Sequence, residues 1–120
     1  MATPLHDPMG LIEAALPFDR APHEALITAV LAWTAPGLPP RDYEQIALQL
    51  TGHARGVAAD VARRAARLPP DDGRRILAEV VLGEASHRLS VPVKGAAGVQ
   101  GRAHLLRALY ERLDGLAGSR

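Results

Sequence analysis

Clustered prolines divide this chain into helix-forming segments. Proline interrupts a helix because it has no backbone N–H to donate and its ring clashes with the preceding turn. Breaks that contain proline fall near residues 17–22, 35–40, 68–72 and 91–98. Each break is followed by a segment whose apolar residues recur with the period of a helix. The positions of these breaks, with the helical periodicity that follows each one, therefore predict four amphipathic helices.

The predicted helices span residues 22–34, 40–68, from the turn at 71–72 to about residue 90, and 99–116. The short link between the second and third helices makes them antiparallel neighbours. The irregular stretch 91–98 is expected to be an extended loop, either a lid or a connector. The fold class predicted is all-α, an up-down-up-down four-helix bundle with an N-terminal arm.

Residues 1–20 are expected to form that arm and residues 21–117 the helical bundle domain. The arm should lie on the body through its apolar side chains, which are Leu5, Met9, Leu11, Ile12, Leu16 and Phe18. A length of 120 residues fits one domain with a single core. The apolar fraction of 48% is mostly Ala, Leu and Val, which predicts closely spaced helices with small side chains.

Charge and composition exclude several classes of function. With 14 Lys and Arg against 13 Asp and Glu, the chain has no long-range field to attract nucleic acid or anionic lipid. The absence of Cys excludes thiolate nucleophiles and thiolate metal sites. The longest apolar stretch is too short to span a bilayer, and the first residues do not resemble a signal peptide. We expect a cytoplasmic protein without nucleic-acid or membrane partners.

Glu84 is the most informative polar residue. At about 100° per residue it projects into the middle of the stripe formed by Ile76, Leu77, Val80 and Val81. A buried carboxylate needs a partner, and Arg88, His87 and His53 are the candidates. Glu84, His53 and His87 are therefore predicted either as an acid–base site or as a structural ion pair.

Two further patterns bear on metal or anion binding. Glu84 and His87 form the Glu-x-x-His spacing of di-iron bundles, but no second motif supplies the other ligands, so no metal or other cofactor is predicted. Six arginines could form a phosphate-binding edge. They are Arg55, Arg63, Arg64, Arg67, Arg74 and Arg75. Acidic residues are interspersed among them, which favours a solvated mixed-charge face.

Trp33, Tyr110 and Arg88 are the candidate ligand-binding residues. We expect Trp33 and Tyr110 inside the bundle or at a cleft, and the Ala-rich helices favour a cleft between the second and third helices. A bound ligand there would be a small molecule or a segment of a partner protein.

Four segments carry a resemblance to a known family, and they are Thr51-Gly52-His53-Ala54-Arg55, Leu68-Pro69-Pro70-Asp71-Asp72, Gly83-Glu84-Ala85-Ser86-His87-Arg88-Leu89 and Ala108-Leu109-Tyr110-Glu111. They are similar to an actinobacterial family of short helical proteins labelled "natural product biosynthesis protein". The similarity covers roughly residues 40–116. Here Ser86-His87 replaces the arginine that usually follows Gly-Glu-Ala. The label implies a role in specialised metabolism, and the resemblance adds interest to His53 and Glu84 as a pair.

Three hypotheses follow for function. The leading one is an accessory protein of specialised metabolism that binds a small molecule or a partner protein. The alternative is a cofactor-free enzyme of the cyclase or isomerase type, with Glu84 and His53 moving protons. The third is a homodimer that exchanges its N-terminal arms.

Overall fold

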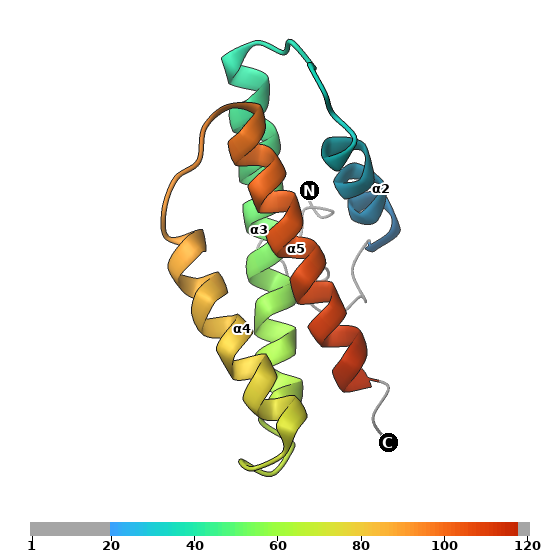
Figure 1. The fold of residues 1–120 in the computed structure, drawn as a ribbon, viewed down its shortest axis with the longest axis vertical. Helices are drawn as coiled ribbons and strands as arrows, with labels where there is room; N and C mark the ends of the chain where they lie inside the picture. Colours follow the sequence, from blue (N-terminus) through green and yellow to red (C-terminus); the bar gives the residue numbers. More distant parts are fainter. Residues whose placement is uncertain (1–19, 118–120) are drawn as a thin grey trace, which may run out of the picture.

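The computed structural model describes residues 20–117, which form four helices: α2 (Arg20–Leu31), α3 (Pro40–Ala65), α4 (Gly73–Leu89) and α5 (Gly95–Ala117). Successive helices run in opposite directions, and no strand occurs within this range (Figure 1). The predicted all-α, up-down-up-down bundle is therefore confirmed. The arm and its apolar side chains lie outside the described residues.

The centre of the bundle is the pair α3 and α5. Leu50, Ala54 and Val57 of α3 meet Val99, Ala103 and Leu106 of α5 in one buried core. All six side chains are fully buried, and the alanines let the two helix backbones approach closely. Helix α4 packs along one edge of this pair and α2 along the other (Figure 1). Sites on α2 and α4 are thus held on opposite sides of the molecule.

The loop before the last helix is shorter than predicted. Helix α5 begins at Gly95, four residues before the predicted start, so the irregular stretch extends only from the end of α4 to Lys94. Gly95 has a φ of +65°, a conformation that glycine adopts without strain. One turn later, a Cβ at Gly98 would come within 2.9 Å of Val93 Cβ. Glycine at these two positions lets the chain turn sharply and the helix start early.

The inner face of α4 differs from the prediction. Ile76, Leu77 and Val80 are about half exposed or more, whereas Ala78, Ala85 and Leu89 are buried. The prediction was wrong because it weighted the larger aliphatic side chains. The residues of α4 that are buried against its neighbours are instead mostly small, as Ala78 and Ala85 are. The turn before α4 is closed by Asp72, whose side chain accepts from the Arg74 backbone N–H at 2.8 Å.

None of the described helices has the length and apolar character needed to cross a membrane.

Candidate functional site

The structure does not bring together the predicted trio of Glu84, His53 and His87. The side chain of Glu84 is 66% exposed, and its contact with Arg88 is loose, at 3.9 Å between Oε2 and Nη1. His87 is also exposed on α4. His53 stacks on His23 of α2, and α2 and α4 lie along opposite edges of the central pair (Figure 1), so the expected burial of Glu84 beside His53 is corrected. The cause is that α4 packs against the bundle through Ala78, Ala85 and Leu89, and not through the face that was predicted.

His53 instead meets Tyr110, another of the predicted site residues. The His53 Nε2 atom is hydrogen-bonded to the Tyr110 hydroxyl, which joins α3 to α5. On its other side, the His53 ring stacks on His23 of α2, with ring centroids 3.6 Å apart and nearly parallel planes. Tyr110 is only 4% exposed. Three helices are therefore tied together at one point, which we call the His53–Tyr110 junction.

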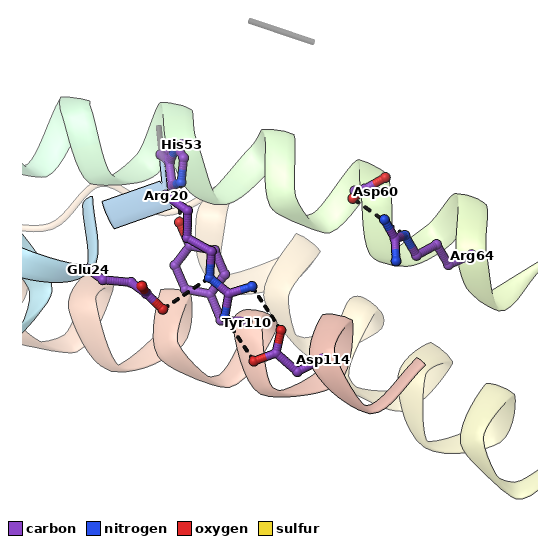
Figure 2. A network of polar contacts seen from close by, with 7 residues as sticks. All are labelled: Arg20, Glu24, His53, Asp60, Arg64, Tyr110 and Asp114. Carbon is purple, nitrogen blue, oxygen red and sulfur yellow. Dashed lines mark hydrogen bonds and ion pairs between the residues drawn. The ribbon is translucent and has the colours of Figure 1, made fainter. Parts of the chain in front are cut away.

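Arg20 covers this junction from the N-terminus of α2. Its Cζ atom lies 4.2 Å from the centre of the Tyr110 ring, within cation–π range. Its Nη1 and Nη2 atoms each donate to Asp114 at 2.8 Å, and its Nε donates to Glu24 at 3.0 Å (Figure 2). The hydrogen bonds to Asp114 are the main cause that raises the pKa of Arg20, and they lower the pKa of Asp114. The cation is thus neutralised by two carboxylates.

Burial raises the pKa of Tyr110 to about 12, with the nearby Arg20 acting in the opposite direction. The hydroxyl is therefore neutral and serves as a hydrogen-bond partner of His53.

A polar groove of about 350 Å³ runs beside Tyr110 between α2 and α5, and charged residues of both signs line it. The paired charges and the buried hydroxyl identify the junction as a brace between helices.

A second, larger groove lies between α3 and α4, on the other side of α3. Its volume is about 510 Å³. Small and aliphatic side chains form most of it, with one arginine and two serines; the lining residues are Arg55, Ala58, Ala59, Ala62, Leu82, Ser86, Leu89 and Ser90. Sequence analysis predicted a cleft between these two helices, and the structure contains it. Trp33 and Tyr110 do not line this groove.

Two arginines cap the C-terminal end of α4 beside this groove. Arg55 Nη2 donates to the Leu89 carbonyl at 3.0 Å. Arg102 of α5 donates from Nη1 to Arg88 O at 2.9 Å and from Nη2 to Val91 O at 2.7 Å. The last carbonyls of a helix lack intrahelical partners. These guanidinium groups therefore supply hydrogen-bond donors to the carbonyls at the C-terminal end of α4.

Arg102 is the functional residue that sequence analysis missed. It is 4% exposed, and its Nε has no hydrogen-bond partner. Burial is the main cause that lowers its pKa, and the neighbouring charges of Arg88 and Arg55 add to the effect. A signal was available in the sequence, because Arg102 lies one helical turn from both Val99 and Leu106 in an apolar stripe.

Trp33 is partly buried against the core, as predicted, and its ring meets Tyr43 edge-on at 5.8 Å between centroids. The predicted mixed-charge face is also confirmed for four of the arginines, which pair with carboxylates. Arg63 and Arg64 pair with Asp60, Arg74 with Asp72, and Arg75 with Glu79, while Arg55 caps α4 instead (Figure 2 shows Asp60 with Arg64). Arg67 is exposed.

Within residues 20–117, no three His, Asp or Glu side chains converge as metal ligands.

Comparison with known proteins gives a family but no activity. Neither a curated protein nor a solved structure matches the chain. Residues 21–118 match the model of a family described as a family of unknown function (DUF6415). Because the match extends over most of the sequence and over all four helices but for the first residue of α2, the protein belongs to this DUF6415 family.

Proposed function

We propose that this protein is a small cytoplasmic accessory protein that binds a small molecule in the groove between α3 and α4. The observation that carries the proposal is the groove itself. A volume of about 510 Å³ lies within the range of about 300–1,000 Å³ that is common for ligand pockets. Its apolar surface offers burial to a hydrocarbon chain, and its polar side chains are few: Arg55, Ser86 and Ser90.

Binding without turnover is the better supported of the two leading hypotheses. The enzyme hypothesis needs Glu84 and His53 within reach of one substrate. Glu84 is solvent-exposed on α4, while His53 is engaged by Tyr110 and His23 at the other side of α3. The role in actinobacterial natural-product metabolism rests on the family resemblance in sequence and is part of the proposal.

The proposal is tested with an uncharged apolar probe, 1-octanol, followed by NMR titration of the purified protein. We expect saturable binding that is lost in Ala62→Trp, because Ala62 is exposed in the groove and an indole there fills it. Ala29→Trp is the matched control, since Ala29 is exposed on α2 outside both grooves. Equal octanol binding by wild type and Ala62→Trp, or no saturable binding at all, would refute the proposal.

A further inference from the structure

Three arginines converge where α4 ends, next to the α3–α4 groove. They are Arg55 of α3, Arg88 of α4 and Arg102 of α5, and we call them the arginine cluster. The charges of Arg88 and Arg55 both act on the Arg102 guanidinium. In the described part of the chain, the cluster has one ion-pair partner, Glu84, which lies 3.9 Å from Arg88 and is mostly exposed.

The cluster therefore holds more positive charge than its surroundings balance. The carbonyls at the end of α4 accept hydrogen bonds from Arg55 and Arg102, but a helix C-terminus supplies only about half of a negative charge. At the His53–Tyr110 junction, by contrast, Arg20 is neutralised by Asp114 at 2.8 Å. Bringing like charges together is unfavourable, and a bound anion would relieve that repulsion.

One member of the cluster faces the groove. Arg55 lines it beside the hydroxyl-bearing Ser86 and Ser90. A guanidinium has five N–H donors, and Arg55 uses one protein acceptor, the Leu89 carbonyl. Its remaining donors match the two oxygens of a carboxylate, which guanidinium groups bind in a forked geometry. The apolar part of the groove extends from this point along Ala58 and Ala62.

We propose that the ligand of the groove is an amphipathic carboxylate, with its oxygens bound by Arg55 and its alkyl chain lying between α3 and α4. This inference rests on the proposed function and narrows it to a class of ligand. Arg88 and Arg102 act as positioning and charge-supplying residues. Arg102 holds the end of α4 in place through its two carbonyl contacts, and both residues raise the positive potential at the carboxylate.

The test compares three probes of equal chain length on the full-length protein: octanoate, 1-octanol and octylammonium. Titrations followed by NMR at low salt should give an affinity for octanoate at least tenfold higher than for octanol, and the lowest affinity for octylammonium. In Arg55→Gln the octanoate advantage should disappear while octanol binding remains. Arg41→Gln, an equal loss of charge on an exposed residue near the N-terminus of α3, should keep the advantage.

A second variant covers the case in which Arg55→Gln does not fold. Ser86→Asp adds a fixed carboxylate at the groove edge and should remove the preference for octanoate. The inference is overturned if wild type binds octanoate and octanol equally, or if the preference persists in either Arg55→Gln or Ser86→Asp. Equal binding of these two probes leaves the proposed function standing, whereas failure of octanol to bind refutes that function. The two failures are therefore distinguishable.

Discussion

Two arginine-centred regions of this bundle use the same side chain in opposite ways. At the His53–Tyr110 junction, Arg20 is neutralised by Asp114 and Glu24 and lies on an aromatic ring. At the end of α4, Arg102 is more deeply buried, yet only carbonyl groups accept from it. Arg20, which is neutralised, only holds helices together. Arg102 has no carboxylate partner, so under our proposal its positive charge also helps to attract an anionic ligand. The predictions below test this contrast.

The largest effect is expected for Arg102→Ala. The change removes the guanidinium donors to the carbonyls of Arg88 and Val91 and opens space in the core. We expect the free energy of unfolding to fall by about 2–4 kcal/mol, measured by urea denaturation. Arg107→Ala on the exposed side of α5 is the control. A loss below about 0.5 kcal/mol for Arg102→Ala would show that the end of α4 does not depend on this contact.

The next effect concerns Tyr110 at alkaline pH. Its folded-state pKa is raised to about 12, whereas an unfolded tyrosine ionises near pH 10. A raised pKa stabilises the fold fully below about pH 10, and this contribution is lost as the pH rises through 12. The loss should reach roughly 2–3 kcal/mol, measured by urea denaturation across this pH range. An equal pH dependence in Tyr110→Phe would assign the loss to other groups.

Arg20→Ala should have a smaller effect than Arg102→Ala. Its carboxylate partners are about half exposed, so solvent screens the pairs. We expect a loss of about 1 kcal/mol that shrinks as salt is added, measured by urea denaturation at two ionic strengths. A loss as large as that of Arg102→Ala, independent of salt, would contradict the distinction between the two regions.

The smallest effect is expected for Glu84→Gln. Because the carboxylate is exposed and only loosely paired with Arg88, the free energy of unfolding should change by less than about 0.5 kcal/mol. Thermal denaturation followed by circular dichroism is sufficient to detect a larger change. A loss of several kcal/mol would restore the sequence-based prediction that Glu84 is buried with a partner.

Much of the fold was predictable because prolines and apolar periodicity act locally. The breaks at 35–40 and 68–72 set the boundaries of α3 and the start of α4, and the long stripe from Leu50 to Val61 identified the inner face of α3. Helix α4 was harder because aliphatic residues occur around most of its circumference. The face of α4 that is buried depends on the distance between α4 and its neighbours α3 and α5. That distance cannot be inferred directly from one sequence.

The candidate site was predictable in part. The cleft between α3 and α4 was expected from the high alanine content of the bundle, and Tyr110 was correctly expected inside it. The partner of His53 was not predicted. The relative position of α3 and α5 brings Tyr110 to His53, and it depends on how the two helices pack. The position of Arg102 in the apolar stripe of α5 indicated its burial, but its contacts also depend on how the helices pack. Its donors satisfy carbonyls 11 and 14 residues away in sequence, and that capping contact has no sequence motif.

The most direct test of a carboxylate site in the α3–α4 groove is a map of amide and side-chain NMR shifts on titration with octanoate. Our account predicts that the largest shifts occur at Ala59, Ala62, Ser86 and the Arg55 guanidinium, while Arg20 and Tyr110 stay unchanged. Shifts centred on the α2–α5 groove around Tyr110, with the Arg55 signals unmoved, would contradict it.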